Sequence, residues 1–243
     1  MRNSRICGNW GVFFLGMAFV LIFFSWIGSV YGVGEVQSLL SAEGMRWMLG
    51  HVVEDYVQTP ALGNVMVLMM GLGVGAKAGM YNALKRFLHN THSLSRKERR
   101  ALMLSVVVWW AYVLLMLLVM LFPWSFLLSV TGSWNHSPLL MGSAYLFSLG
   151  MGITGMVYGC ISDVFKRVSD VFESMSFLLA RHASYFVTLF LVVQCFGFLN
   201  YTQLDTWLGL SEEAVAVLFN FSCYFPLLYD LIVVAGSQKK SLG

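Results

Sequence analysis

Long apolar runs separated by short polar stretches make up most of this chain. Each run is close to the ~20 residues that a helix needs to cross ~30 Å of hydrocarbon. A helix satisfies the hydrogen bonds of its own backbone in that setting. We therefore predict an all-α polytopic membrane protein with about six transmembrane helices, folded as a single membrane domain over residues 1–243. The predicted spans are Trp10–Val33, Leu62–Met80, Ala101–Phe122, Leu139–Ile161, Ala183–Asn200 and Ala214–Ala235.

Two further stretches mix apolar and charged positions and are too polar to span. Ser41–Tyr56 begins with a serine followed closely by Glu43, a pattern typical of a helix N-terminus. Asp163–Leu179 has a similar mixture of valines, phenylalanines and charges. We predict that both are amphipathic helices at the membrane surface.

The composition supports the membrane class. Hydrophobic residues make up 58% of the chain and charged residues 11%, and the mean hydropathy is +0.72. A soluble domain of 243 residues could not bury that much apolar surface. The cysteines Cys7, Cys160, Cys195 and Cys223 are scattered without metal or redox spacing, so we interpret them as packing residues.

The positive charges fall almost entirely on one side of the predicted spans. Six spans place 14 of the 15 Lys and Arg residues together and leave Arg46 alone on the other side. The positive-inside rule then predicts that both termini and the basic loop Tyr81–Arg100 are cytoplasmic. That loop lacks the interleaved aromatic residues of a nucleic-acid platform, so we expect no nucleic-acid partner.

Two spans carry glycines at close helical spacing, which lets helix backbones approach each other. Helix packing inside the bundle is the simpler interpretation and the one we favour. A subunit interface or a pivot is the alternative, and the sequence does not separate the two. The helix-packing candidates are Gly71, Gly75, Gly79, Gly152, Gly155 and Gly159.

A few polar residues fall inside apolar runs. Asp230 follows Pro226 by four residues, and an acid within a span is a functional hypothesis by default, although this one lies near the cytoplasmic end. Gln194 could form an interhelical hydrogen bond, which we prefer, or line a pathway. No HExxH, GxSxG or Walker motif and no metal-ligand spacing occurs, so we predict neither an enzyme nor a metal site.

Sequence motifs occur at Glu43–Trp47, Gly71–Gly79 and Ser137–Gly159, and together they resemble motifs of the AbgT family of p-aminobenzoyl-glutamate transporters. "EGMRW", from Glu43 to Trp47, is similar to the family's E-G-[apolar]-R-W helix, and "GLGVGAKAG" is similar to the turn that ends its next span. Ser137–Gly159 is similar to a span that starts "SP" and ends "GxVYG". Met175–Leu204 and Cys223–Leu231 are similar to later segments. The resemblance covers most of the chain.

The resemblance implies a secondary transporter without a bound cofactor. Its substrate would be p-aminobenzoyl-glutamate or a related folate-derived or antimetabolite compound, coupled to H⁺ or Na⁺. It also implies a homodimer in the bacterial inner (cytoplasmic) membrane. The substrate-pathway candidates are Asn200, Tyr201, Gln194, Asn220 and Asp230, of which Asn200 and Tyr201 sit in a matched family motif.

Two parts of the family pattern are missing. Members are roughly twice as long, and their re-entrant hairpins would follow Gly79 and Leu208 of this chain, where short stretches stand instead. Such transporters place substrate and ion sites on broken helices and hairpins. The alternative function is therefore a transport-incompetent scaffold or partner subunit that keeps the dimerisation helices. In a variant of it, a second polypeptide supplies the missing transport core.

Overall fold

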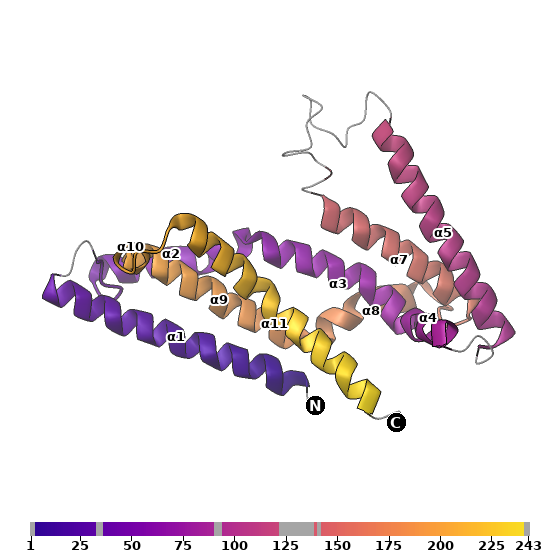
Figure 1. Cartoon of the computed structure of the whole chain (residues 1–243), viewed down its shortest axis with the longest axis horizontal. Coiled ribbons are helices and arrows are strands. Elements are labelled where there is room, and N and C mark those ends of the chain that lie inside the picture. The colour runs from indigo at the N-terminus through magenta and orange to yellow at the C-terminus, as the bar shows by residue number, and fades with distance from the viewer. Residues whose placement is uncertain (1–2, 33–35, 90–93, 122–138, 140–141, 241–243) are drawn as a thin grey trace. The chain divides into compact units, whose positions relative to one another are not determined.

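The structure is a computed structural model that describes residues 3–32, 36–89, 94–121, 139 and 142–240, with side chains described between Trp10 and Tyr229. Every regular element that these residues form is an α-helix (Figure 1). The predicted all-α class is therefore confirmed. The helices are α1 (Asn3–Tyr31), α2 (Ala42–Gln58), α3 (Pro60–Ala78), α4 (Met80–His89), α5 (Arg96–Leu121), α7 (Ser143–Ile161), α8 (Val168–Arg181), α9 (Ala183–Thr202), α10 (Leu204–Trp207) and α11 (Glu212–Lys240).

Five of the predicted spans are confirmed as helices long and apolar enough to cross a membrane: α1, α3, α5, α7 and α9. The sixth predicted span lies inside α11, whose side chains are described only as far as Tyr229. Val33, Phe122, Leu140 and Met141 of the predicted spans lie outside the described residues.

The first predicted surface helix is α2, and its start is the one expected. Ser41 is the N-cap, and its Oγ accepts a hydrogen bond from the Gly44 N–H at 3.0 Å. A capping serine satisfies one of the backbone N–H groups that the first turn of a helix leaves unpaired. Glu43 adds a negative charge to the same turn, where the helix dipole favours it.

The second predicted surface helix is α8, and a side chain from inside the helix caps its start. The Asp170 carboxylate accepts hydrogen bonds from the N–H groups of Lys166, at 2.9 Å, and Arg167, at 3.0 Å. An acid in the third helical position that reaches back to the capping residue is half of a capping box. These two bonds hold the pKa of Asp170 below its usual value.

Acidification is expected to loosen the start of α8. Because the pKa of Asp170 is lowered in the folded state, its contribution is complete above the ordinary carboxyl pKa of ~3.9 and is lost as the pH falls through the folded value. Hydrogen exchange of the Lys166 and Arg167 amides, corrected for intrinsic rates, should accelerate in that window. Asp170→Ala should give the faster exchange already at neutral pH. Asp163→Asn, which removes a nearby acid that does not bond to these amides, should leave it unchanged.

One prediction about the basic loop was wrong. Tyr81–Arg100 was expected to be a loop, but it contains most of α4 and the start of α5. Gly79 ends α3 with φ +80, and the Ala83 N–H then donates to the Gly79 carbonyl at 3.0 Å as α4 begins. The many lysines and arginines made this stretch resemble a loop, but it forms a short amphipathic helix in which Met80 and Ala83 are buried.

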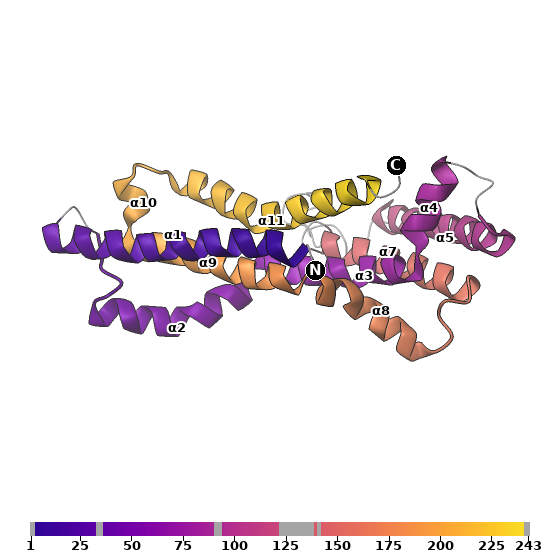
Figure 2. The same cartoon turned by 90° about the horizontal axis from the view of Figure 1, so that it is seen from below.

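The described residues group into two compact units, and the predicted single membrane domain stays a prediction. Unit 1 comprises Met1–Leu62 and His182–Gly243, and unit 2 comprises Gly63–Arg181. In unit 1, α1, α9 and α11 pack against one another, and α2 lies against α9 (Figures 1 and 2). The Cys195 thiol donates to the Phe14 carbonyl at 3.0 Å, and the Tyr185 hydroxyl donates to the Cys223 carbonyl at 2.9 Å.

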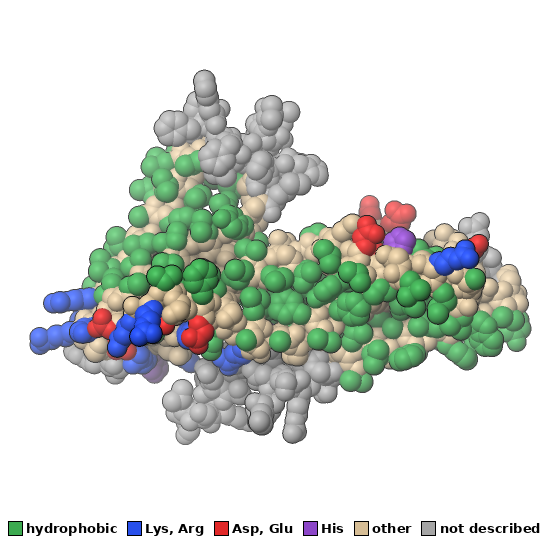
Figure 3. Space-filling view, turned by 180° about the vertical axis from the view of Figure 1, so that it is seen from behind, with side chains coloured by type: hydrophobic (Ala, Val, Ile, Leu, Met, Phe, Trp, Pro, Cys, Tyr) green, Lys and Arg blue, Asp and Glu red, His purple; other side chains and the backbone are tan. Residues whose placement is uncertain are grey.

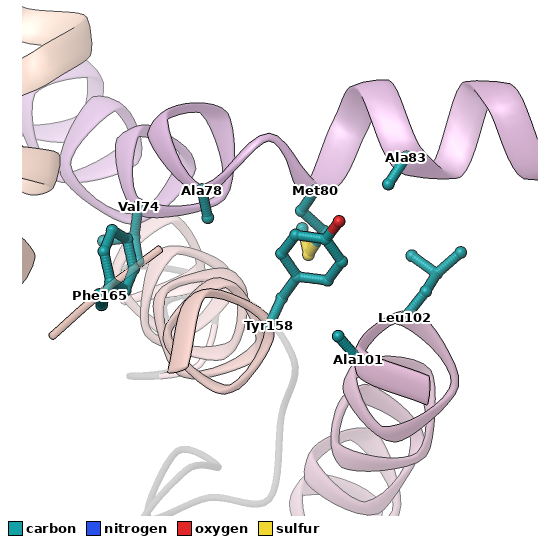
Figure 4. Packing of buried hydrophobic residues seen from close by; sticks show 8 residues of the cluster. All are labelled: Val74, Ala78, Met80, Ala83, Ala101, Leu102, Tyr158 and Phe165. Carbon is teal, nitrogen blue, oxygen red and sulfur yellow. The ribbon is translucent and has the colours of Figure 1, made fainter. Parts of the chain in front are cut away.

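In unit 2, apolar side chains from α3, α4, α5 and α7 meet in one core (Figure 4). Tyr158 of α7 lies in its middle and is 2% exposed. This core fixes α4 against α5. Its buried members are Val74, Ala78, Met80, Ala83, Ala101, Leu102, Tyr158 and Phe165.

The glycines of α3 and α7 face each other within unit 2. A Cβ on Gly155 would lie 2.7 Å from the Gly75 nitrogen, and one on Gly71 would overlap the Ser148 carbonyl oxygen. The Gly71 N–H donates to the Ser148 Oγ at 3.1 Å. A Cβ on Gly152 would lie 3.7 Å from the Gly71 Cα. This contact uses the glycine faces inside the chain, as the simpler interpretation of the sequence expects.

Two of the candidate glycines have other surroundings. Gly159 lies against the ring of Phe165, where the chain reverses after α7. A Cβ on Gly79 would meet no described atom within 4 Å, and the φ of this residue is +80, so the helix-packing role predicted for Gly79 is wrong. Its role is to allow the left-handed backbone of the turn between α3 and α4.

Candidate functional site

A cavity of about 820 Å³ lies within unit 1, between α2, the second half of α9 and the start of α11. Its size is within the ~300–1,000 Å³ typical of small-molecule sites. Residues of α2, α9, α10 and α11, the first residue of α3 and the turns between these helices supply its walls. The lining residues are Trp47, Asp55, Gln58, Thr59, Pro60, Val193, Phe196, Gly197, Asn200, Gln203, Asp205, Thr206, Glu212, Val215, Ala216 and Phe219.

Two sharp turns bring these residues together. Gln203 adopts a left-handed conformation, φ +54, which ends α9 and redirects the chain into α10. Gly209, φ +68, then turns the chain toward α11. At the opposite wall, α2 ends at Thr59, whose hydroxyl donates to the Asp55 carbonyl at 2.6 Å. The site is therefore built from the sides of α2 and α9 together with the turns at Thr59 and Gln203 and the start of α11.

The charge of the lining is negative. Asp55, Asp205 and Glu212 contribute carboxylates, and the lining contains no Lys, Arg or His. The Oδ1 of Asp205 is buried and has no hydrogen-bond partner among the described residues. A buried, unpaired carboxylate oxygen is costly, so a proton, a cation or a ligand donor would stabilise it.

Neutral polar groups complete the lining. Gln58, Asn200 and Gln203 supply amides, and Thr59 and Thr206 supply hydroxyls. Amides can donate and accept hydrogen bonds, so they can orient a ligand that carries both kinds of group. Among the described residues, no group of three or more His, Cys, Asp or Glu side chains is arranged to hold a metal ion.

Trp47 forms an aromatic wall of the cavity. Its ring stacks with Tyr201, with centroids 4.5 Å apart and planes at 25°, and with His51, with centroids 5.0 Å apart. These contacts fix a large flat side chain at the edge of the cavity. Phe196 and Phe219, with ring centroids 5.3 Å apart, contribute a second aromatic surface.

The structure separates the predicted pathway residues. Asn200 lines the cavity, and Tyr201 lies directly behind Trp47. Gln194 is buried away from the cavity, and its amide donates to the Val52 carbonyl of α2 at 2.9 Å, which is an interhelical hydrogen bond. Asn220 donates to the Ala216 carbonyl of its own helix at 3.0 Å and does not line the cavity. Asp230 lies on α11, and its side chain is outside the described part.

Sequence reasoning missed seven polar residues of the lining: Asp55, Gln58, Thr59, Gln203, Asp205, Thr206 and Glu212. The available signal was that the three acids fall between predicted spans on the same side of the membrane. Nothing in the sequence marks Gln203 as a left-handed residue.

A second cavity, of about 530 Å³, lies between α1, α9 and α11 in the same unit. Aromatic and aliphatic side chains dominate its lining, including Trp10, Phe14 and Phe225, and Ser222 contributes a hydroxyl. With no charged residue in its lining, it offers no group to recognise a charged solute.

The helical fold and its five candidate spans indicate a multi-pass membrane protein, and its polar cavity is large enough for a small solute. The AbgT putative transporter family matches residues 12–95 and 85–237. The chain belongs to this family, whose members are transporters and not enzymes. It therefore resides in a lipid bilayer. No curated protein matches the chain.

Two solved structures are similar to this fold. The YdaH transporter of Alcanivorax borkumensis superposes with a TM-score of 0.68 at 17% identity, and the match covers 82% of this chain and 74% of the YdaH chain. MtrF of Neisseria gonorrhoeae, described among a class of antimetabolite efflux pumps, gives a TM-score of 0.74 at 14% identity, with 92% and 80% covered. At such identities the likeness shows the fold alone. The covered shares of the two solved chains do not confirm the strongly shortened form expected from the sequence, and that form stays a prediction.

Proposed function

We propose that this protein is a secondary transporter of p-aminobenzoyl-glutamate or of a related folate-derived or antimetabolite compound, coupled to H⁺ or Na⁺. The observation that carries the proposal is the cavity of about 820 Å³ whose lining includes Asn200, from a motif that resembles the family's. The family membership supplies the transport activity. The cavity supplies a place for the solute.

The chemistry of the cavity suits an aromatic amide. The flat rings of Trp47, Phe196 and Phe219 offer stacking surfaces for an aminobenzoyl ring. The amides of Asn200 and Gln203 can pair with the amide and carboxyl groups of the same solute. A substrate of this size fits a volume of about 820 Å³.

The carboxylates argue for cation coupling. A substrate with two carboxylates would meet Asp55, Asp205 and Glu212 with no basic residue in the lining to balance them. Like charges in a partly enclosed site repel each other strongly. A proton or Na⁺ bound beside the unpaired Oδ1 of Asp205 would remove that repulsion. The cation is then required for substrate binding, which is the basis of coupled transport.

The membrane assignment follows from the charge distribution. With 14 of 15 Lys and Arg residues on one side of the six predicted spans, we place that side and both termini in the cytoplasm of a bacterial cell. The polar cavity, beside the end of α9 and the start of α11, then lies toward the opposite side.

The alternative is a scaffold or partner subunit that does not transport. One observation favours it: the cavity lining lacks any cationic side chain for an anionic substrate. A homodimer, or a second polypeptide that supplies a transport core, would complete such a protein. In either case the interface would use other faces than those of Gly71 and Gly155, because these glycines already pack between α3 and α7 inside unit 2.

Substrate binding to the purified chain tests the coupling. We expect p-aminobenzoyl-glutamate to bind about 5- to 30-fold more tightly with saturating Na⁺ than in Na⁺-free buffer, because one neutralised carboxylate changes the binding free energy by ~1–2 kcal/mol. Asp205→Asn should bind with little dependence on Na⁺. Equal binding in all buffers by the unmodified chain would contradict the coupling.

A further inference from the structure

We propose that a basic surface of unit 2 binds the headgroups of anionic phospholipids. The basic surface is defined by the exposed cations of α4, the start of α5 and the turn before α8. Figure 3 shows Lys and Arg side chains gathered there among hydrophobic ones, at the left of the view. Its members are Lys85, Arg96, Arg99, Arg100, Lys166 and Arg167.

Unit 2 has no acid left to pair with these cations. The unit holds ten Lys and Arg residues and four Asp and Glu residues, and all fourteen lie in its described stretches. Three acids form ion pairs: Lys77 with Glu173, Arg86 with Glu98, and Lys97 with Asp163. The fourth, Asp170, accepts from the start of α8. The other seven cations form no side-chain ion pair within the unit.

Ion pairs hold together the segments that carry these cations. The Arg86–Glu98 pair, at 3.0 Å, joins α4 to the start of α5. The Lys97–Asp163 pair, at 2.8 Å, joins the start of α5 to the turn between α7 and α8. The paired cations thus organise the segments, and the unpaired ones beside them in sequence remain available. Arg181, at the far end of α8, is the seventh and lies outside the surface.

The start of α5 is rich in positive charge. Its first turn and a half contains Arg96, Lys97, Arg99 and Arg100 against a single acid, Glu98. The positive end of a helix dipole disfavours cations, typically by several tenths of a kcal/mol each. Local structure gives no compensation for Arg96, Arg99 and Arg100. An external anion at this helix end would provide it.

Exposed apolar side chains near the cations favour a lipid rather than a soluble ion as the anion. Apolar side chains project between the cations: Leu88 of α4 is 78% exposed, Val168 of α8 is 74% exposed and Phe172 is 68% exposed. A short helix with exposed leucines next to Lys85 and Arg86 has the character of a helix that lies at a membrane surface. Basic residues in that position attract anionic headgroups.

Lipid addition to the purified full-length chain tests the proposal. In neutral detergent, dioleoylphosphatidylglycerol should raise the Tm and remain bound in native mass spectra, whereas dioleoylphosphatidylcholine, with the same tails, should not. The variant Arg96→Gln/Arg99→Gln/Arg100→Gln should lower the phosphatidylglycerol affinity about a hundredfold, at roughly fivefold per charge. The variant with lysine at the same three positions should retain the affinity.

The controls separate charge at this surface from charge in general. Arg99→Gln should weaken phosphatidylglycerol binding, whereas Arg46→Gln, on α2 of unit 1, should not. Equal stabilisation by the two lipids would overturn the proposal, and so would an equal loss in the glutamine and lysine triple variants. A full Tm increase with inorganic phosphate alone would show a soluble-anion site and would also overturn it. No transport substrate is present, so the outcome is independent of the proposed function.

Discussion

Leucine in place of Gly155 is expected to prevent unit 2 from folding. A Cβ at this position would lie 2.7 Å from the Gly75 nitrogen and 2.9 Å from the Gly75 Cα, and both are backbone atoms. The remaining side-chain carbons would have to separate α3 from α7, which also breaks the bond from the Gly71 N–H to Ser148. We expect a loss of more than about 3 kcal/mol of unfolding free energy. Thermal unfolding in detergent, with size-exclusion chromatography, measures it.

Gly152→Ala is the matched control on the same helix. Its Cβ would lie 3.7 Å from the Gly71 Cα, an ordinary van der Waals distance. Alanine also favours a helix by up to ~1 kcal/mol over glycine, so this variant should match or exceed the Tm of the unmodified chain. An unchanged Tm for Gly155→Leu would mean that α3 and α7 do not meet at these glycines. A Gly155→Leu chain that folds but loses an oligomer would instead restore the subunit-interface interpretation.

Alanine in place of Asn200 is expected to lower transport by about 10- to 100-fold. The Asn200 amide lines the cavity and is solvent-exposed there, so it is available to a solute. Losing one or two hydrogen bonds that form to the substrate removes ~1–3 kcal/mol. The measurement is the initial rate of p-aminobenzoyl-glutamate uptake into proteoliposomes, with the amount of folded protein matched between samples.

Asn220→Ala is the control for that experiment, because it removes the same side chain from the same unit. Asn220 bonds to the Ala216 carbonyl of its own helix and lies outside the cavity lining. Its removal should leave the uptake rate within about twofold, since a surface change of this kind costs ~0.5 kcal/mol or less. Equal losses in both variants would show that the cavity does not select between them.

The transmembrane helices could be predicted because length and apolarity alone decide them. Trp10–Val33 and Ala183–Asn200 are continuous apolar runs, and a helix satisfies the backbone hydrogen bonds of such a run within the run itself. The helix α4 could not be recognised in the same way. It has only ten residues, and Lys85 and Arg86 made its sequence typical of a loop. What makes it a helix is the burial of Met80 and Ala83 against α5 and α7, a tertiary contact.

The site was predictable only where a motif marked it. Asn200 and Tyr201 were identified by resemblance, and the structure places one in the cavity and the other behind Trp47. Gln194 and Asn220 are equivalent polar residues on apolar helices, and only the neighbouring helix distinguishes them. The Val52 carbonyl of α2 faces Gln194, whereas Asn220 bonds within its own helix.

The acids of the cavity were out of reach for a related reason. Asp205 and Glu212 reach the same space as Asp55 because the chain reverses at Gln203 and again at Gly209. A glutamine with φ +54 carries no sequence signal, since glycine and asparagine are the residues expected in that conformation. Tertiary packing holds Gln203 there, and the sequence alone does not reveal it.

The central claim is that this chain transports by itself, and flux through the purified chain tests it most directly. Proteoliposomes that contain only this protein would be loaded with buffer, given p-aminobenzoyl-glutamate outside, and compared with and without an imposed H⁺ or Na⁺ gradient. We predict gradient-dependent uptake above that of empty liposomes, abolished when the gradient is collapsed. No uptake by protein shown to be folded in the same liposomes would contradict the claim and would favour a scaffold that needs a second polypeptide.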